Sequence, residues 1–430
     1  MSDTLRVGLA GLGTVGSGVL RLLAENESII AARAGRQVRP VAVSARNRNR
    51  DRGTSIEHLR WLDDPLDLVR DPEIDVVVEL IGGADGPAKA LVEAAIEAGK
   101  PVVSANKAML AEHGVGLAAR AEAAGTPLRF EAAVAGGIPV IKTLREGLAA
   151  NRIASLAGIL NGTCNYILTT MFAERREFDE VLADAQALGY AEADPSFDID
   201  GIDAAHKLAI LAAIAFGRQV DLGAVHVEGI RRISMLDISF AEELGYRIKL
   251  LGIARASTNG IETRVHPAMI PANAPLAHVE GVFNAIVAEA EPVGRLVLQG
   301  RGAGGGPTAS AVVADLIDVA RGRSAPMLGV ATDWLATLPS LPMSAHRGAY
   351  YLRLTVLDRP GVIADVAAIL RDQAISLESL LQHGRSQDEA VPVVLVTHVT
   401  QEAAMRAALD RIEALDAVIE PPVLVRIEPQ

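Results

Sequence analysis

A lysine and an aspartate one helical turn apart form the clearest candidate for proton transfer in this sequence. Asp203 and Lys207 are spaced i, i+4, so on a helix their side chains share one face. Lys207 directly precedes the apolar run Leu-Ala-Ile-Leu-Ala-Ala-Ile, which indicates that its ammonium group is partly buried. Burial lowers the pKa of a lysine and a nearby carboxylate raises it, and a proton donor that works near pH 7 needs such tuning. We therefore favour chemistry over the alternative, a routine ion pair on a helix surface.

A run of acidic residues precedes this pair. Residues 189–211 place five carboxylates before a strongly apolar stretch, namely Glu192, Asp194, Asp198, Asp200 and Asp203. Such a group can bind the ammonium group of an amino-acid substrate. The alternative is a helix N-terminus that is rich in acids because they stabilise the helix dipole. For Asp194 and Asp200 the two interpretations stay equally open.

The sequence Gly-Leu-Gly-Thr-Val-Gly at 11–16 fits the pattern G-x-G-x-x-G between a predicted strand and a predicted helix. In that setting the pattern is typical of a dinucleotide-binding turn, although an ordinary strand–turn–helix corner is the alternative. Gly11 permits the tight turn, Gly13 lets the backbone approach the pyrophosphate, and Gly16 lets the helix pack closely on the strand. The N-terminus of the helix would stabilise the phosphate charge. A second polar motif, Ser-Ala-Asn-Lys at 104–107, follows another predicted strand, where doubly wound sheets bind their ligands.

The end of the second predicted strand bears on the choice between NAD and NADP. An acidic residue there would accept a hydrogen bond from the ribose 2′-hydroxyl of NAD. This chain instead reads Val-Ser-Ala-Arg-Asn-Arg-Asn-Arg at 43–50, and guanidinium groups suit a 2′-phosphate. We predict that NADP(H) is preferred, with Arg46 as the first candidate for the phosphate contact. NAD(H) stays the alternative, because a charged loop is often only a solvated surface.

The elements that position these residues alternate short apolar runs with helical patterns over about the first 130 residues. Strands are predicted at 5–10, 38–43, 75–80, 101–104 and 128–130. This alternation predicts an α/β fold that begins with a Rossmann-type doubly wound parallel sheet. Further strands are predicted at 151–160, 246–254 and 261–265, and further helices at 178–188, 202–215 and 309–321. The central region is therefore expected to be an α+β domain.

Residues 349–430 begin a new pattern. A strand, the turn Asp-Arg-Pro-Gly at 358–361 and an amphipathic helix come first, and two strands, a helix and a strand follow. This βαββαβ order is that of a ferredoxin-like unit. Residues 323–348 contain prolines and serines with little periodicity, which indicates mostly linker.

The composition limits the classes of function. The chain has 430 residues, 50% of them hydrophobic, and a net charge of −12, which suggests about three domains with full-sized cores. An acidic surface repels phosphate backbones, so we expect no nucleic-acid partner. The single cysteine, Cys164, excludes an intrachain disulfide and fits a cytoplasmic location. Residues 1–6 show no signal-peptide pattern, and the longest apolar stretch, 208–216, is too short to span a membrane.

Several of these segments together resemble one family. They are Gly-Leu-Gly-Thr-Val-Gly (11–16), Ser-Ala-Asn-Lys (104–107), Glu-Ala-Ala-Val-Ala-Gly-Gly-Ile-Pro-Val-Ile (131–141), Gly-Ile-Leu-Asn-Gly-Thr-Cys-Asn-Tyr-Ile-Leu (158–168), the acidic segment 189–211 and Gly-Ala-Gly-Gly-Gly-Pro-Thr-Ala-Ser-Ala-Val-Val-Ala-Asp-Leu (302–316). In this order they resemble the homoserine dehydrogenases over nearly the whole chain. The sequence Leu-Asp-Arg-Pro-Gly-Val-Ile-Ala (357–364) resembles an ACT domain, an amino-acid-sensing fold. The resemblance implies reversible interconversion of L-homoserine and L-aspartate 4-semialdehyde with NAD(P)(H), on the route to threonine and methionine.

The resemblance also implies roles for single residues. Lys207 would be the general acid that protonates the aldehyde oxygen, Asp203 would orient it, and Lys107 would position substrate and nicotinamide. The substrate-binding residues would be Glu192, on the ammonium group, with Asp198, Thr163 and Tyr190. The cofactor-binding residues would be Gly11, Gly13, Thr14, Val15, Gly16, Arg46, Ser104, Lys107, Gly304 and Gly305. A sodium or other monovalent cation would be bound by Glu131 with carbonyl groups of Val134, Gly136 and Ile138, although a buried acid that caps a turn is the alternative.

The resemblance finally implies an organisation into domains. Residues 1–135 would bind NAD(P), and residues 136–322 would form the catalytic and dimerisation domain, with 302–321 returning to the nucleotide site. Residues 323–348 would be a linker and 349–430 a regulatory ACT domain that responds to an amino acid such as threonine. ACT modules usually bind ligands across paired copies, so a homodimer or homotetramer is expected. A catalytically silent sensor of NADPH or amino acids, or a dehydrogenase of another small amino aldehyde, is the alternative, but a sensor needs no proton-donating lysine.

Overall fold

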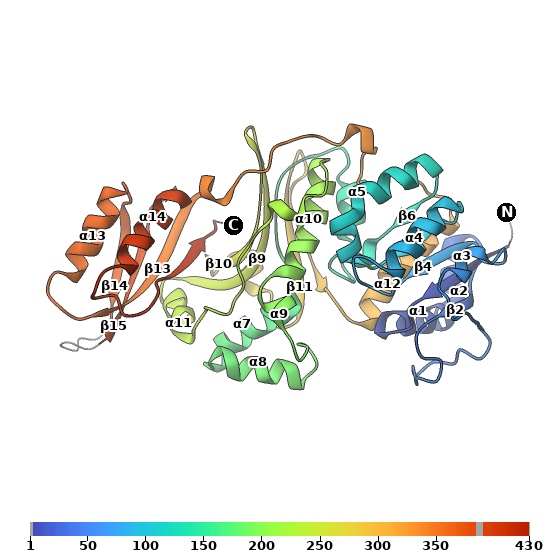
Figure 1. Ribbon diagram of the computed structural model, residues 1–430, viewed down its shortest axis with the longest axis horizontal. Helices are drawn as coiled ribbons and strands as arrows, with labels where there is room; N and C mark the ends of the chain where they lie inside the picture. The colour runs from blue at the N-terminus through green and yellow to red at the C-terminus, as the bar shows by residue number, and fades with distance from the viewer. Residues whose placement is uncertain (1–2, 384–389, 430) are drawn as a thin grey trace. The chain divides into compact units, whose positions relative to one another are not determined.

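The computed structural model describes residues 3–383 and 390–429 (Figure 1). The chain passes back and forth between two compact units. The first unit comprises Met1–Leu160, Asp203–Val225 and Phe283–Leu338, and the second comprises Asn161–Ile202, His226–Val282 and Pro339–Gln430. Among the helices in the described ranges, none combines the length and the apolar character that a membrane crossing requires.

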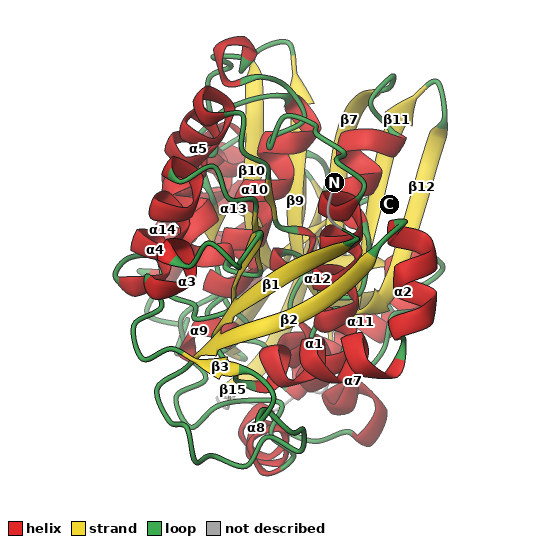
Figure 2. Ribbon diagram, turned by 90° about the vertical axis from the view of Figure 1, so that its right-hand side faces the viewer, coloured by secondary structure: helices red, strands yellow, loops and turns green. Residues whose placement is uncertain are grey.

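The first unit contains a parallel sheet with the strand order β3-β2-β1-β4-β5-β6. The strands are β1 (Thr4–Ala10), β2 (Gln37–Ser44), β3 (Arg60–Trp61), β4 (Val76–Glu79), β5 (Val102–Ser104) and β6 (Leu128–Arg129). This is the strand order of a Rossmann-type sheet. All strands are parallel, and the order in which the chain adds them changes side between β1 and β4. The predicted doubly wound sheet is therefore confirmed, and the strands β1 to β3 lie side by side in Figure 2.

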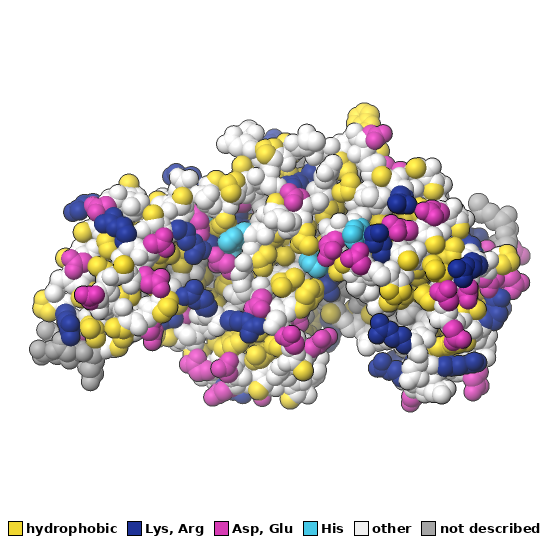
Figure 3. All heavy atoms as spheres, in the orientation of Figure 1, with side chains coloured by type: hydrophobic (Ala, Val, Ile, Leu, Met, Phe, Trp, Pro, Cys, Tyr) yellow, Lys and Arg dark blue, Asp and Glu magenta, His cyan; other side chains and the backbone are white. Residues whose placement is uncertain are grey.

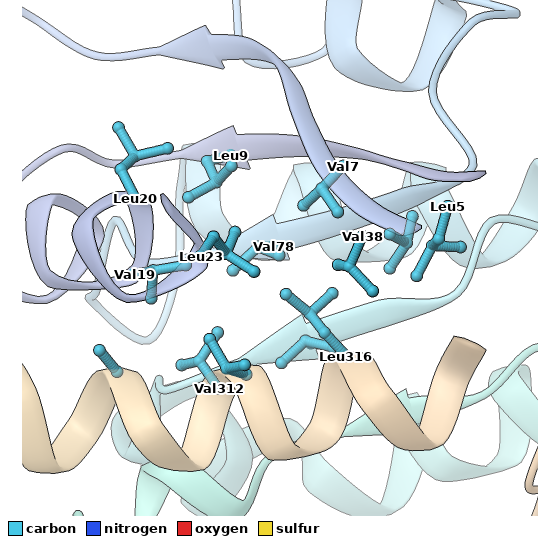
Figure 4. Close-up of a cluster of buried hydrophobic side chains, with 14 of the residues drawn as sticks. Leu5, Val7, Leu9, Val19, Leu20, Leu23, Val38, Val78, Val312 and Leu316 are labelled. Atoms are coloured by element: carbon cyan, nitrogen blue, oxygen red, sulfur yellow. The ribbon is translucent and has the colours of Figure 1, made fainter. Parts of the chain in front are cut away.

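Helices cover this sheet because their apolar faces pack on its valine- and leucine-rich strands. The helices are α1 (Thr14–Glu25), α2 (Glu27–Ala34), α3 (Asp67–Arg70), α4 (Pro87–Glu97), α5 (Lys107–Ala124) and α12 (Gly305–Ala320). Val19 and Leu23 of α1 and Leu316 of α12 are buried in one core with Val7 of β1 (Figure 4). Figure 1 shows α12 beside α1 although the two are far apart in sequence. Burial of each such side chain contributes about 1.5–3 kcal/mol.

The rest of the first unit consists of three antiparallel strands, helix α10 and several short helical turns. Strands β7 (Arg152–Ile159), β11 (Phe283–Glu291) and β12 (Gly294–Arg301) pair antiparallel in the order β12-β11-β7. The short helices η1 (Glu131–Ala133), α6 (Val140–Lys142) and η2 (Thr143–Gly147) precede β7. Helix α10 (Ile202–Phe216) carries Asp203 in its first turn and is buried over most of its length, as its apolar sequence predicts. Two 3-10 turns follow, η3 (Leu222–Ala224) and η5 (Thr332–Trp334).

The second unit combines helices with a mixed sheet. It contains α7 (Gly162–Glu174), α8 (Phe178–Ala187), α9 (Ser196–Ile199), β8 (His226–Val227), α11 (Met235–Glu243), β9 (Tyr246–Ser257), β10 (Gly260–Pro271) and η4 (Pro275–His278). β9 and β10 form a long antiparallel hairpin in which Ser257 pairs with Gly260. The strand predicted at 261–265 is therefore longer than its short apolar run indicated, since β10 is buried along nearly its whole length.

The last part of the second unit is the predicted ferredoxin-like module. It consists of β13 (Arg347–Leu357), α13 (Val362–Asp372), β14 (Leu377–Gln382), β15 (Ala390–Thr397), β16 (Thr400–Gln401), α14 (Glu402–Glu413) and β17 (Val423–Ile427), after a short turn η6 (Met343–Ala345). Its sheet has the order β17-β13-β15-β14, with one core between sheet and helices. β17 also pairs parallel with β10, where Ala268 faces Arg426. The module thus extends the β9–β10 hairpin into one sheet within this unit.

Candidate active site

The predicted dinucleotide turn lies at the carboxyl end of β1. Gly11 has a φ of 98°, and a Cβ atom there would lie 2.3 Å from the carbonyl oxygen of Leu80. A Cβ atom on Gly16 would lie 2.1 Å from the carbonyl oxygen of Gly11, so glycine is needed for α1 to begin against the strand. Gly13 precedes α1 without a side chain, and the space around its Cβ position is open. A phosphate group can therefore approach the N–H groups of the first helical turn.

The second glycine-rich segment brings another helix N-terminus to the same place. Gly304 precedes α12, and a Cβ atom on Gly305 would lie 3.1 Å from the carbonyl oxygen of Thr14. A Cβ atom on Gly18 would lie 2.6 Å from the carbonyl oxygen of Gly305, so the two helices meet backbone to backbone. Gly13, Thr14 and Gly305 line a cavity of about 480 Å³. Two helix N-termini with partial positive charge suit an anion such as a pyrophosphate there. The side chain of Val15, in contrast, packs against the core.

An arginine-rich loop follows β2 beside this turn. A second cavity of about 440 Å³ is lined by Gly11 and Ser44 together with Arg46, Arg50 and Arg52. Arg52 donates hydrogen bonds to the carbonyl oxygens of Leu12 (3.3 Å) and Arg50 (2.7 Å), which ties the loop to the glycine turn. Figure 3 shows Lys and Arg side chains gathered near the part of the first unit where Figure 1 labels α1 and β2. The sequence pattern indicated Arg46, whereas the role of Arg52 depends on how the loop folds back.

A buried glutamate organises the ends of β4 and β5. Glu79 is fully buried, and its Oε2 accepts a hydrogen bond from Ser104 Oγ (2.6 Å). Its Oε1 accepts from the backbone N–H groups of Ile81 and Gly82 at the turn after β4. The Ser104 oxygen in turn accepts from the backbone of Asn106, whose side chain caps α5 just before Lys107. Glu79 thus aligns the segment that carries Ser104 and Lys107. The sequence analysis did not identify Glu79. A single acidic residue at the end of an apolar strand was the feature that could have indicated its role.

Three charged side chains meet in the first unit at the start of α10. Lys207 Nζ lies 2.7 Å from Asp203 Oδ2 and 2.8 Å from the carbonyl oxygen of Leu160, the residue after β7. Lys107 Nζ lies 3.0 Å from the other carboxylate oxygen of Asp203. The side chain of Asp203 is 5% exposed, that of Lys207 11% and that of Lys107 33%. The predicted Lys207–Asp203 contact is present, and the structure adds Lys107 to it.

This cluster has the geometry of a proton donor. An ammonium group has three N–H donors, and Lys207 uses two of them on Asp203 and Leu160 among the residues that the structure describes. The third donor is available to a substrate oxygen. Two ammonium groups share one carboxylate, so the cluster has an excess of positive charge that would stabilise a developing alkoxide. Burial and the charge of Lys107 lower the pKa of the neighbouring His206, which keeps that imidazole neutral near pH 7.

Three of the predicted substrate-binding residues are in contact in the second unit. Asn161 Nδ2 donates to Asp198 Oδ1 (2.8 Å), and Thr163 Oγ1 lies 3.1 Å from Asp198 Oδ2. The same hydroxyl lies 2.8 Å from the carbonyl oxygen of Tyr190. Asn161 also caps α7 by accepting from the backbone N–H of Cys164, a buried residue. Asp198, on α9, is thus held against the N-terminus of α7, and Asn161 is a site residue that the sequence analysis did not name.

The other acids of the 189–211 segment lie differently. Glu192 is exposed, and among the described residues its carboxylate has no hydrogen bond to this group. Tyr190 is 44% exposed and its ring packs edge-on against Tyr166. Hydrogen bonds from the side chain and then the backbone of Ser196 lower the pKa of Asp194. Asp200 pairs with Arg231. Asp194 and Asp200 therefore have partners within the second unit.

The proposed cation site is centred on a buried glutamate in the first unit. Glu131 is 2% exposed, and its two carboxylate oxygens accept from the backbone N–H groups of Ile141 (2.9 Å) and Lys142 (2.8 Å). Burial and the nearby Asp315 raise the pKa of Glu131 to about 7. Consecutive left-handed residues, Ala135 and Gly136, turn the backbone between β6 and α6. Glu131 thus caps α6, and each of its oxygens has a further lone pair for a cation.

The comparisons with known proteins agree with this geometry. The sequence model described as homoserine dehydrogenase matches residues 139–317, that of its NAD-binding domain matches residues 11–131, and that of the ACT domain matches residues 350–417. A homoserine dehydrogenase of Pseudomonas aeruginosa is 49% identical over 99% of both chains, and one of Helicobacter pylori is 45% identical over 100% of both.

Solved structures give the same assignment. The crystal structure of a homoserine dehydrogenase from Thiobacillus denitrificans has a TM-score of 0.94 and 51% identity, and covers 99% of this chain and 98% of that one. A hyperthermophilic archaeal homoserine dehydrogenase in complex with NADPH has a TM-score of 0.64 and 25% identity, and covers 75% of this chain and 99% of that one. The chain belongs to the homoserine dehydrogenase family, whose members are NAD(P)-dependent oxidoreductases that act on a CH–OH group, and it carries a C-terminal ACT domain.

Proposed function

We propose that this protein interconverts L-aspartate 4-semialdehyde and L-homoserine and that Lys207 moves the proton. The observation that supports the proposal is the contact of Lys207 with both Asp203 and the Leu160 carbonyl oxygen, which fixes the ammonium group and leaves its third N–H for a substrate oxygen. The reduced nicotinamide, when bound, supplies the hydride to the aldehyde carbon. Lys207 Nζ then gives its proton to the aldehyde oxygen, which becomes the hydroxyl of homoserine. In the reverse direction the neutral amine of Lys207 accepts the hydroxyl proton.

The neighbours of Lys207 have supporting roles. Asp203 holds the Lys207 ammonium in one orientation. Lys107, bound to the other oxygen of Asp203, adds positive charge beside the reacting oxygen and positions substrate and nicotinamide. In the second unit, Asp198 with Thr163 would bind the amino-acid part of the substrate. Exposed Glu192 and Tyr190 would complete that subsite, with Glu192 on the ammonium group.

The cofactor in this proposal is NADP(H), with NAD(H) as the alternative. Gly11, Gly13 and Gly16 admit the pyrophosphate to the N-terminus of α1, and Gly304 and Gly305 bring the N-terminus of α12 beside it. Thr14 and Val15 would contribute backbone N–H groups, and Ser104 would face the nicotinamide end. Arg46, Arg50 and Arg52 line the cavity at the end of β2, where a 2′-phosphate would carry negative charge. The bound NADPH in the archaeal relative supports this choice.

The cation site and the assembly are further parts of the proposal. A sodium ion at Glu131, with carbonyl groups of Val134, Gly136 and Ile138, would offset the cost of a buried carboxylate charge next to Asp315. We propose the domain boundaries 1–135, 136–322, 323–348 and 349–430, a cytoplasmic location, and a homodimer or homotetramer. L-Threonine is the proposed effector of the ACT domain. The presence of that domain and of bacterial relatives supports these proposals.

The decisive experiment is a substrate assay. We expect oxidation of NADPH with L-aspartate 4-semialdehyde and reduction of NADP⁺ with L-homoserine, both followed by absorbance, and lower kcat/KM with NADH and NAD⁺. L-Serine and L-threonine, which share the amino-acid group but present the hydroxyl one carbon closer, serve as controls and should be poor substrates. Absence of turnover with purified, folded protein and both cofactors would favour the sensor alternative.

A further inference from the structure

The segment after β8 lies directly on the helix that carries Asp198. The backbone N–H of Ile230 donates to the carbonyl oxygen of Ile199 (2.8 Å), the residue that follows Asp198. A Cβ atom on Gly229 would lie 2.3 Å from that same oxygen, so the two backbones touch. Arg231 reaches Ser196 Oγ (2.9 Å) at the other end of α9. Residues 229–231 therefore hold both ends of α9.

The same segment is anchored at its other end in the ACT domain. Glu228 precedes Gly229, and its two carboxylate oxygens accept from Arg426 Nη1 (2.8 Å) and Nη2 (3.0 Å). Arg426, on β17, also forms two hydrogen bonds with Glu402 at the start of α14. Arg406 of α14 adds a further contact with Glu228 (2.6 Å). Paired guanidinium–carboxylate contacts of this type define both distance and orientation.

Arg426 and Glu402 of this anchor are buried, Glu228 is partly buried, and their charges are matched. The side chain of Arg426 is 1% exposed and that of Glu402 3%. Burial raises the pKa of Glu228, but hydrogen bonds from His226 and Arg426 outweigh it and hold this pKa below its ordinary value. Burial likewise raises the pKa of Glu402, and its hydrogen bonds with Arg426 reverse the direction. Both carboxylates are therefore charged at neutral pH, so the position of Arg426 determines the position of Glu228.

We propose that Arg426 and Glu228 are positioning residues that connect the ACT domain to the substrate-binding Asp198. The connection runs from Arg426 to Glu228, along the backbone to Ile230, and through its hydrogen bond to Ile199. All of these residues lie in the second unit. A change in β17 that moves Arg426 would then change the affinity for the amino-acid substrate and leave the chemical step intact. This inference rests on the proposed role of Asp198 in substrate binding.

The first experiment uses Glu228→Gln, which keeps the size of the side chain and removes its charge. We expect the KM for L-homoserine to rise about five- to tenfold, within the usual range of coupling between sites. We expect kcat and the KM for NADP⁺ to stay within about twofold, because Lys207 and the nucleotide turn are not in this network. A purely structural role would instead lower the amount of active enzyme and leave KM unchanged. If Glu228→Gln does not fold, Arg406→Met, on the exposed side of the anchor, should give a smaller rise in KM.

A matched control distinguishes positioning from general loss of a buried charge. Asp237 is fully buried and binds Arg353 of β13 (2.7 Å), so it too joins the ACT domain to the rest of this unit. Among the residues that the structure describes, Asp237 forms no hydrogen bond or ion pair with α9. Asp237→Asn should therefore leave the KM for L-homoserine unchanged. An equal rise in KM in this variant would overturn the proposal.

A double-mutant cycle separates failure of this inference from failure of the proposed function. Asp198→Asn should raise the KM for L-homoserine, and Glu228→Gln added to it should raise KM no further, because Glu228 acts through Asp198. No effect of Asp198→Asn would contradict the substrate-binding role itself. An effect of Asp198→Asn with an unchanged KM in Glu228→Gln would contradict only the positioning role. Additive effects of the two variants would also contradict it.

Discussion

The first unit holds Asp203 between the ammonium groups of Lys107 and Lys207, and the second unit holds Arg426 between the carboxylates of Glu228 and Glu402. One cluster is an anion between two cations, and the other is a cation between two anions. Both central side chains are nearly inaccessible to solvent, at 5% and 1% exposure. The clusters therefore use the same kind of interaction in opposite arrangements.

The chemistry of the two cations explains why the arrangements serve different ends. A lysine ammonium can lose its proton under the influence of its surroundings. Among the described residues, Lys207 donates to Asp203 and Leu160, which leaves its third N–H for a ligand. A guanidinium group stays charged, and Arg426 uses its planar fork on Glu228 and Glu402 at once. The lysine cluster is suited to moving a proton, whereas the arginine cluster is suited to holding backbone segments in place.

The largest effect is expected from Lys207→Met, which removes the proton donor and keeps much of the side-chain volume. We expect kcat to fall about 10²- to 10⁴-fold, the usual contribution of general acid–base catalysis. Binding of NADPH, measured by its fluorescence, should be retained. Lys207→Arg is the sharper control, because it keeps the charge next to Asp203 but does not exchange a proton near neutral pH. Nearly normal turnover in Lys207→Arg would mean that charge alone suffices.

The arginine cluster should show its effect in stability. Arg426→Met leaves the buried Glu402 and the partly buried Glu228 without their shared cation, which we expect to cost about 3–5 kcal/mol in the unfolding of the second unit. Urea unfolding followed by circular dichroism measures this loss. Arg411→Met is the control, since Arg411 pairs with Asp372 at the surface and its loss should cost less than about 1 kcal/mol. Equal losses in the two variants would show that burial does not distinguish the pairs.

The buried carboxylate of Glu131, bound by two backbone N–H groups, should make the stability of the protein depend on pH. The pKa of Glu131 is raised to about 7, so between its ordinary pKa and pH 7 the folded state binds more protons than the unfolded state. The stability that this group contributes is present at low pH and is lost as the pH rises through about 7. In buffer without sodium, we therefore expect Glu131→Gln to be about 1–3 kcal/mol more stable relative to the wild type at pH 8 than at pH 5.

Sodium provides the internal control for this prediction. Since a cation offsets the buried charge, sodium chloride should raise the Tm of the wild type at pH 8 more than choline chloride does. The difference between the two salts should vanish in Glu131→Gln. Equal responses of the wild type to sodium and choline would leave Glu131 as a helix cap without a cation.

The smallest effect is expected at the exposed arginines of the nucleotide loop. Arg46→Ser should lower the preference for NADPH over NADH about tenfold in kcat/KM, which corresponds to about 1.4 kcal/mol. Arg48→Ser is the matched control, because Arg48 is adjacent in the loop and packs over Trp61 outside the cavity lined by Arg46. If both variants lower the preference equally, the loop acts through general charge and no single contact carries the choice of cofactor.

Local spacing explains most of what could be predicted from the sequence. In the glycine pattern at 11–16, Gly16 is required locally, because a Cβ atom there would lie 2.1 Å from the carbonyl oxygen of Gly11. Asp203 and Lys207 meet because a helix places residues four apart on one face. The order of the elements in residues 349–430 predicts the ferredoxin-like module, since its apolar runs alternate with the period of strands and helices. Each of these inferences needs only the spacing or the order of residues along one continuous stretch of the chain.

Contacts between distant segments depend on the tertiary structure. No local pattern places Lys107 and the Leu160 carbonyl oxygen around the Asp203–Lys207 pair, or Glu79 under Ser104. The acids of the 189–211 segment could not be told apart by sequence. In the fold, Asp198 contacts the N-terminus of α7, whereas Glu192 is exposed at the surface. The strength of a charge pair depends on burial and on every neighbour, and these are set by the packing of segments that lie far apart along the chain.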